Sequence, residues 1–111
     1  LATLHWEIEP VHYLIGYAGK NVRCAPYELF GTEELAQAAL KAMEDRNACL
    51  LANHGLLAIG GTVEYAFDTA EETEFVAELY YKAKCVGEPI PLKSEEMDEF
   101  LEKFKPYGKK L

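Results

Sequence analysis

The stretch Ala48-Cys-Leu-Leu-Ala-Asn-His54-Gly-Leu-Leu-Ala-Ile-Gly60-Gly61 contains two short apolar runs that are separated by a turn signal. Runs of four or five apolar residues are long enough for buried strands and too short for helices. Between them, Gly55 permits a bulge or a close approach of the backbone. The sequence therefore predicts two strands, at 48–52 and 56–59, with His54 projecting from a strand end.

His54 is a polar ring within an otherwise apolar segment. A neutral imidazole at a strand end can bind a metal ion or donate a proton. The alternative is a histidine that is satisfied by backbone hydrogen bonds, as most buried polar groups are. The residue pattern alone leaves both interpretations open.

Two further β-type segments, 11–15 and 22–25, flank a turn rich in Gly and Asn, which predicts a paired edge. Thr32 is a good N-cap for a helix that runs from Glu33 to about Asp45. Strands that alternate with helices predict the fold class α/β, a layered sheet of about four strands with helices packed on it.

Two more helices are expected. Thr62 caps a long helix over 63–86, which Gly87 ends. Ser94 is expected to cap a third helix, whose apolar residues recur at i, i+3, i+4 and i+7: Met97, Phe100, Leu101 and Phe104. Apolar residues also predict the buried stripes: Leu35, Ala36, Ala39, Leu40 and Met43 in the first helix, and Val63, Ala66, Phe67, Ala70 and Ala77, continued by Phe75, Val76, Leu79, Tyr80 and Ala83, in the second.

Composition excludes several classes of function. The 111 residues carry a formal charge of -8, which argues against a nucleic-acid or anionic-membrane surface. No apolar run reaches the ~18 residues of a membrane-spanning helix. The three cysteines show no Cys-x-x-Cys pairing, so neither a disulfide framework nor a zinc ribbon is indicated, and a reducing cytoplasm fits best.

Spacing alone identifies few catalytic candidates. His5 and His12 are seven residues apart, which is not a typical spacing of metal ligands. The sequence shows no Ser-His-Asp order, no phosphate-binding glycine loop and no paired catalytic carboxylates. What remains is one histidine, His54, and two tyrosines, Tyr13 and Tyr107.

Four segments, in order, resemble the class II aldolase and adducin-head family, and in particular its fuculose-phosphate aldolase branch. They are Glu9-Pro-Val-His12-Tyr13-Leu-Ile, Cys24-Ala-Pro26-Tyr27-Glu-Leu-Phe30-Gly31-Thr32, Leu50-Leu-Ala-Asn-His54-Gly55-Leu and Leu101-Glu-Lys-Phe104-Lys-Pro-Tyr107-Gly108. The resemblance implies a partial α/β/α domain. Residues 1–111 would be its C-terminal portion, without the N-terminal half, and 94–111 would be a C-terminal helix and tail.

The resemblance also implies an activity and its residues. A family member of this branch is a zinc-dependent lyase that cleaves a ketose 1-phosphate to dihydroxyacetone phosphate and an aldehyde. By motif, His54 would be one of three zinc-binding histidines and Tyr13 a proton donor near the aldehyde oxygen. Phe30 and Phe104 would line the substrate pocket. Tyr107 would act from a tail that closes over the site of a neighbouring subunit in a homotetramer.

The other zinc ligands, the acid-base glutamate and the phosphate loops would lie upstream, so the 111 residues alone are expected to be inactive. Zinc would act as a Lewis acid, and a phenol, with an ordinary pKa of about 10, can protonate a more basic alkoxide. Other interpretations remain: a non-catalytic, adducin-like assembly module, or a sugar-phosphate 4-epimerase or dehydratase. Tyr13 would then be a packed edge tyrosine, and the tail a solvated terminus.

Overall fold

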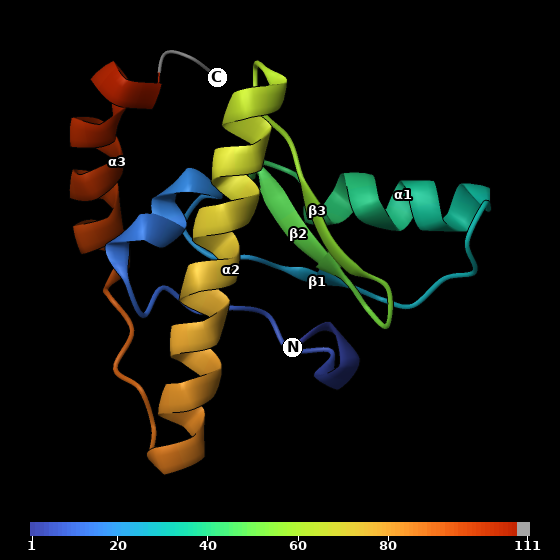
Figure 1. Ribbon diagram of the computed structural model, residues 1–111, viewed down its shortest axis with the longest axis horizontal. Coiled ribbons are helices and arrows are strands. Elements are labelled where there is room, and N and C mark those ends of the chain that lie inside the picture. Colours follow the sequence, from blue (N-terminus) through green and yellow to red (C-terminus); the bar gives the residue numbers. More distant parts are fainter. Residues whose placement is uncertain (109–111) are drawn as a thin grey trace.

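The computed structural model describes residues 1–108, with side chains described as far as Phe104. The chain forms a small sheet with helices on both faces (Figure 1). The elements in order are the 3-10 helices η1 (Ala2–Leu4) and η2 (Tyr13–Tyr17), strand β1 (Cys24–Ala25), helix α1 (Glu33–Ala42), strands β2 (Ala48–Leu51) and β3 (Gly55–Ala58), and helices α2 (Val63–Val86) and α3 (Ser94–Gly108).

The described sheet has three strands in the order β1-β2-β3. β1 pairs with β2 in parallel, with Cys24 opposite Leu50, and β2 pairs with β3 as an antiparallel hairpin. The hairpin confirms the two strands predicted around His54. The paired edge predicted from 11–15 and 22–25 is wrong, because residues 13–17 form η2 and the partner of Val22 is Ile8, in an isolated bridge.

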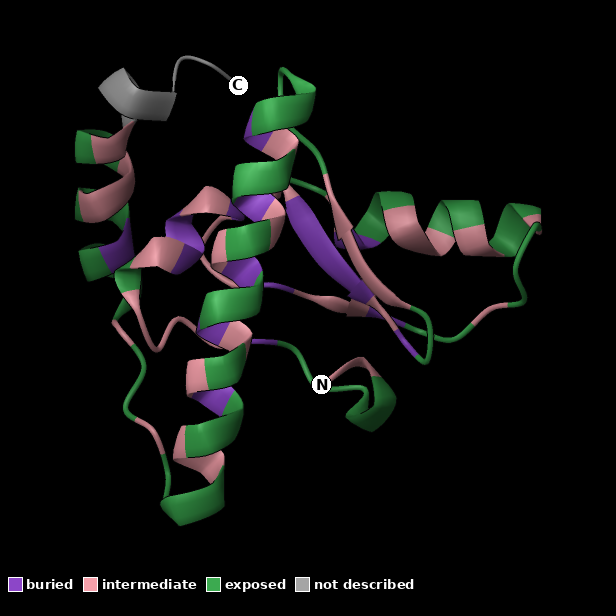
Figure 2. Ribbon diagram, in the orientation of Figure 1, coloured by how far each residue is buried: buried purple, intermediate pink, exposed green. Residues whose placement is uncertain are grey.

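Alternate residues of β2 face two different cores, as the period of a strand requires. Ala48 and Leu50 belong to the larger core, which α2, η2 and α3 cover. Cys49 belongs to a smaller core with Ala25 and with Ala42 of α1. Figure 2 shows β2 buried between the two helical layers. The architecture is therefore the α/β/α layering that the family resemblance implies.

The predicted stripe holds in the second half of α2, where Val76 and Tyr80 are buried, whereas α1 and the first half of α2 bury other residues. In α1, Ala42 is buried and Ala38 packs beside it, whereas the predicted Leu40 is 65% exposed. In α2 the buried stripe is Tyr65, Thr69, Thr73, Val76 and Tyr80. Its first half uses two threonines in place of Val63 and Phe67, which are both exposed. Thr69 and Thr73 lie on the same helix face, since they are four residues apart. A prediction that used only apolar residues therefore chose the wrong face for the first half of α2.

The start of α3 differs from the expected cap. The Lys93 backbone N–H donates to Glu96 Oε1 at 2.8 Å, and the Met97 N–H donates to the Lys93 carbonyl at 3.0 Å. Lys93 is therefore the N-cap residue, and Glu96 supplies the reciprocal bond of a capping box. Ser94 lies inside the first turn, where its hydroxyl accepts from Lys20 Nζ at 3.0 Å.

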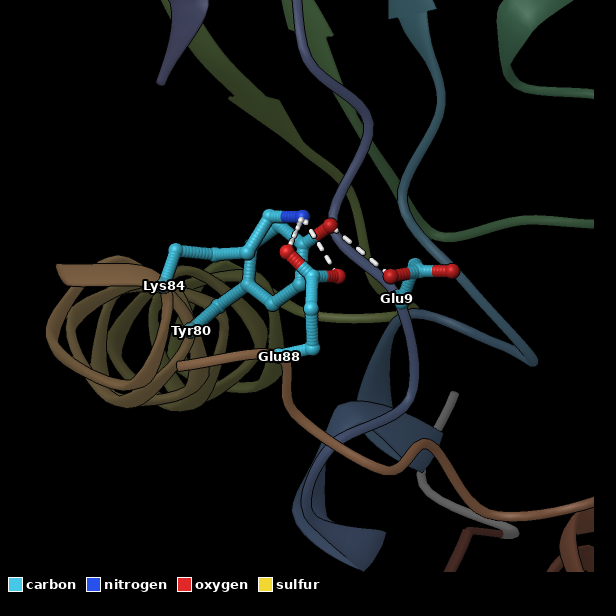
Figure 3. A network of polar contacts seen from close by, with 4 residues as sticks. All are labelled: Glu9, Tyr80, Lys84 and Glu88. Atoms are coloured by element: carbon cyan, nitrogen blue, oxygen red, sulfur yellow. Dashed lines mark hydrogen bonds and ion pairs between the residues drawn. The ribbon is translucent and has the colours of Figure 1, made fainter. Parts of the chain in front are cut away.

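A polar cluster ties the segment before η2 to the far half of α2. The Tyr80 hydroxyl donates to Glu9 Oε2 at 2.9 Å, and Lys84 Nζ lies 3.4 Å from Glu88 Oε2 (Figure 3). The Leu92 N–H donates to the Pro10 carbonyl at 2.8 Å. Residues 9 and 10 are thus held from two sides, immediately before η2. Within residues 1–108, none of the helices is long and apolar enough to cross a membrane.

Candidate active site

The turn between β2 and β3 presents His54 as the sequence predicts. Asn53 has φ 62° and Gly55 has φ 141°, so both occupy the left-handed side of backbone space. Gly55 adopts that conformation without the strain of a Cβ atom. The His54 N–H donates to the Leu51 carbonyl at 2.8 Å, which closes the turn at the end of β2.

The loop after β1 holds the imidazole of His54. Nε2 lies 2.8 Å from the carbonyl oxygen of Glu28, and the ring stacks on Tyr27 with centroids 5.3 Å apart and planes at 4°. Because a carbonyl oxygen only accepts, Nε2 carries the proton and the lone pair of the neutral ring is at Nδ1. The structure thus shows a feature of each interpretation of His54. The ring has a backbone hydrogen bond, and it is exposed with a lone pair at Nδ1 that a metal ion could use.

His54 fits a metal site as one ligand of several. A backbone carbonyl that fixes one ring nitrogen is the usual outer partner of a metal-bound histidine. Among the residues that the structure describes, however, no group of three or more His, Cys, Asp or Glu side chains is placed to hold a metal ion. A catalytic zinc needs three protein ligands, so these residues alone do not complete such a site.

Tyr13 is the first residue of η2 and is 52% exposed. Its ring begins a row of aromatic side chains in which it lies 5.2 Å from Phe100, between ring centroids. Phe100 is 5.2 Å from Phe104, and Phe104 is 4.9 Å from Tyr17. Phe104 thus packs on its own chain, at the end of the described side chains.

His12 is a residue that sequence reasoning left without a role. Its Nδ1 accepts a hydrogen bond from the Leu14 N–H at 3.1 Å, which caps η2. Its ring stacks on Tyr13 with centroids 4.6 Å apart and planes at 25°. Phe75 of α2 meets the same ring edge to face at 5.4 Å. The signal was hidden because 11–15 reads as a strand, and a strand has no cap.

The predicted site residues fall into two groups. His54 lies at the β2–β3 turn beside the loop that carries Phe30, which is 76% exposed. Tyr13 begins η2 and packs on Phe100 of α3, which packs on Phe104. In Figure 1, η2 and α3 lie on the other side of α2 from the β2–β3 hairpin. The side chain of Tyr107 lies outside the described residues. One copy of the described chain therefore does not bring Tyr13 to His54.

A hollow of about 820 Å³ opens beside Gly55, between the hairpin and α2. Its wall is formed by apolar residues of the N-terminal turn and of β2 and β3, and by a face of α2 that presents Glu71, Glu74, Phe75, Ala77, Glu78 and Tyr81. Three carboxylates repel an anion. The hollow is consequently unsuited to the phosphate group of a sugar phosphate.

The sequence of this α/β/α sandwich identifies its protein family. The sequence profile described as "Class II Aldolase and Adducin N-terminal domain" matches residues 1–81, and the chain belongs to this family.

The similarity extends to particular enzymes. The chain is 54% identical over 108 residues to 5-deoxy-D-ribulose 1-phosphate aldolase of Bacillus thuringiensis serovar kurstaki, covering 97% of this chain and 51% of that protein. It is 42% identical over 110 residues to L-fuculose phosphate aldolase of Escherichia coli K12, covering 97% and 51%. A solved structure of an L-fuculose 1-phosphate aldolase matches with a TM-score of 0.93 at 50% identity, covering 95% of this chain and 50% of that one. The chain thus spans about half the length of these relatives.

Proposed function

We propose that this chain is part of a metal-dependent aldolase that cleaves a ketose 1-phosphate to dihydroxyacetone phosphate and an aldehyde. The observation that carries the proposal is the 54% identity to an aldolase, in a chain whose candidate ligand His54 stands exposed at a fixed turn. The relatives are named for 5-deoxyribulose 1-phosphate and fuculose phosphate, both deoxy sugars that end in a methyl group. The proposed substrate class shares that methyl end.

In the proposed site, His54 holds the metal, which we take to be zinc, with ligands from the half of the relatives that this chain does not span. When bound, the metal supplies Lewis-acid stabilisation of the charge that develops as the carbon–carbon bond breaks. The phosphate is gripped outside this chain as well, in keeping with the acidic wall of the hollow. This chain would accordingly be the C-terminal portion of the whole enzyme.

Tyr13 is the proposed proton donor. In the condensation direction its hydroxyl protonates the alkoxide that forms from the aldehyde oxygen. In cleavage the phenolate oxygen of Tyr13 takes the proton back from the substrate hydroxyl. Because Tyr13 and His54 lie apart within one copy, we propose that a neighbouring subunit completes the site, as a homotetramer would allow. Phe30, Phe104 and Tyr107 are assigned to the pocket and its closing tail. Three free cysteines support a reducing compartment, the cytoplasm.

The test uses the intact protein that carries this chain. Release of dihydroxyacetone phosphate is measured with 5-deoxyribulose 1-phosphate and with L-fuculose 1-phosphate, before and after chelation of metal. We expect metal-dependent cleavage. His54→Ala should lose bound metal and more than about 100-fold of the activity, beyond what loss of an outer-shell partner costs. His5→Ala, a nearby exposed histidine, should keep both.

Cleavage that survives complete removal of metal would contradict the proposed chemistry. Stoichiometric zinc in His54→Ala, measured by elemental analysis, would return His54 to a purely structural role. A folded protein without lyase activity on either substrate would favour the adducin-like assembly module, and activity only as an epimerase or dehydratase would favour those branches.

A further inference from the structure

We propose that His12 is the positioning residue of Tyr13: its imidazole both caps the helical turn that begins at Tyr13 and forms the wall against which the phenol ring rests. This inference rests on the proposed role of Tyr13 and deepens it. It follows from three contacts of one ring: with the Leu14 N–H, with the face of Tyr13 and with Phe75.

The cap fixes the backbone at Tyr13. His12 is extended, with φ -150° and ψ 141°, and the chain turns into η2 at the next residue. A five-residue 3-10 helix has few hydrogen bonds of its own, so a side-chain acceptor at its N-cap is a large share of what holds it. Because Nδ1 accepts from Leu14, the ring proton of neutral His12 resides on Nε2.

The stack fixes the side chain of Tyr13. One side of the phenol meets the His12 ring at 4.6 Å, and Phe100 lies 5.2 Å away by ring centroids. Phe75 meets the imidazole edge to face at 5.4 Å, so α2 supports it. The phenol is bounded by these rings while half its surface stays open, as an outward-directed proton donor requires.

On the N-terminal side of His12, hydrogen bonds anchor the chain. Residues 9 and 10 are tied to Tyr80 and to Leu92, as described above. On the other side of Tyr13, the ring of Phe100 covers Gly16 so closely that a Cβ atom there would overlap it. Between these anchors the Tyr13 ring is half exposed, and His12 is its immediate neighbour.

Two variants separate the two tasks of His12 in the intact protein. His12→Asn keeps an acceptor near the position of Nδ1 and removes the stacking ring. His12→Phe keeps a flat ring and removes the acceptor. Hydrogen exchange of the amides in 14–17 should quicken about fivefold in His12→Phe and stay near wild type in His12→Asn. Loss of an N-cap interaction lowers the stability of a helix start by a free energy that corresponds to about this factor.

The ring is followed separately by fluorine resonance of 3-fluorotyrosine at position 13, assigned with Tyr13→Phe. His12→Asn should move this resonance toward that of the free amino acid, and His12→Phe should not. In activity, Tyr13→Phe should lower kcat about 100-fold. His12→Asn should lower kcat about tenfold with an unchanged KM, and should cost nothing further in the Tyr13→Phe background.

A kcat effect of His12→Asn that persists in full with Tyr13→Phe would overturn the proposal, because His12 would then act elsewhere. Unchanged amide exchange in His12→Phe, or an unmoved fluorine resonance in His12→Asn, would also overturn it. If Tyr13→Phe keeps wild-type kcat, the proposed catalytic role of Tyr13 fails, while amide exchange and the fluorine resonance still decide whether His12 positions the ring.

Discussion

Tyr80 combines burial with a charged partner. It is 5% exposed, and its hydroxyl donates to Glu9, while Trp6 packs edge-on at 6.3 Å between ring centroids. Burial is the main cause that raises the pKa of Tyr80, from 10.0 to about 12, and the hydrogen bond to Glu9 adds to it. The folded state therefore favours the neutral phenol.

A pKa that is raised on folding gives stability that is present below the unfolded value and is lost as pH rises through the folded value. Between pH 10 and about 12, the wild-type free energy of unfolding should fall. Tyr80→Phe should be less stable by about 1.5 kcal/mol at pH 8, the worth of a hydrogen bond to a charged group. That difference should shrink across the same pH window.

Urea unfolding at a series of pH values measures both variants. Tyr81→Phe is the matched control, since Tyr81 is the next residue of α2 and is 52% exposed. It should retain the wild-type pH dependence. Parallel curves for wild type and Tyr80→Phe from pH 10 to 12 would show that this hydroxyl is not the group that titrates.

At the scale of elements, the start of α3 offers a direct comparison of two glutamates in one turn. Both side chains are exposed, and Glu96 accepts from the Lys93 N–H at 2.8 Å. Both are acidic residues near a helix N-terminus and share its favourable dipole. Only Glu96 also satisfies a backbone donor.

Glu96→Ala should lower the free energy of unfolding by about 1 kcal/mol, as loss of a capping interaction does. Glu95→Ala should cost about 0.5 kcal/mol or less, the dipole contribution alone. Thermal or urea denaturation measures both. Equal losses would show that charge, and not the bond to Lys93, stabilises this helix start.

The elements that the sequence predicted correctly are those with strong local signals. Thr32 and Thr62 accept from the Leu35 and Tyr65 N–H groups at 3.2 and 3.0 Å, as caps should, and α2 spans the predicted range. The turn at His54 was predicted because Gly55 interrupts two apolar runs. In each case neighbouring residues carry the whole signal.

The errors arise where distant contacts decide. Residues 13–17 have the composition of a strand but coil because His12 caps them and Phe100 covers Gly16. The contact of Phe100 with Gly16 has no local signature, and the cap at His12, although local, uses a residue type outside the usual N-cap set. The separation of Tyr13 from His54 was inaccessible from the sequence, since it depends on how elements far apart in sequence pack.

At the scale of the whole molecule, the C-terminal helix connects the fold to the proposed chemistry. Met97 is fully buried in the main core, and Phe100 and Phe104 continue the aromatic row from Tyr13. Deleting everything after Lys103 in the intact protein removes Phe104 and the segment beyond it. We expect a lower turnover, because a closing tail excludes water and positions a hydroxyl.

Tyr107→Phe should reproduce the part of that loss that is due to the hydroxyl alone. Steady-state kinetics with the accepted substrate measures both variants, and unfolding curves check that the truncated protein is folded. Wild-type kcat and KM after truncation would show that the tail is only a chain terminus.

The main core joins residues that are far apart in sequence, so the ribosome adds them at different times. Ile8, Val22 and Met97 are all fully buried in one cluster, and Lys20 pairs with Asp98 at 2.7 Å. During synthesis the early apolar side chains must wait until α3 has left the ribosome, because their last core partner is on that helix. A chain interrupted before residue 97 therefore exposes an unfinished apolar surface, which favours aggregation.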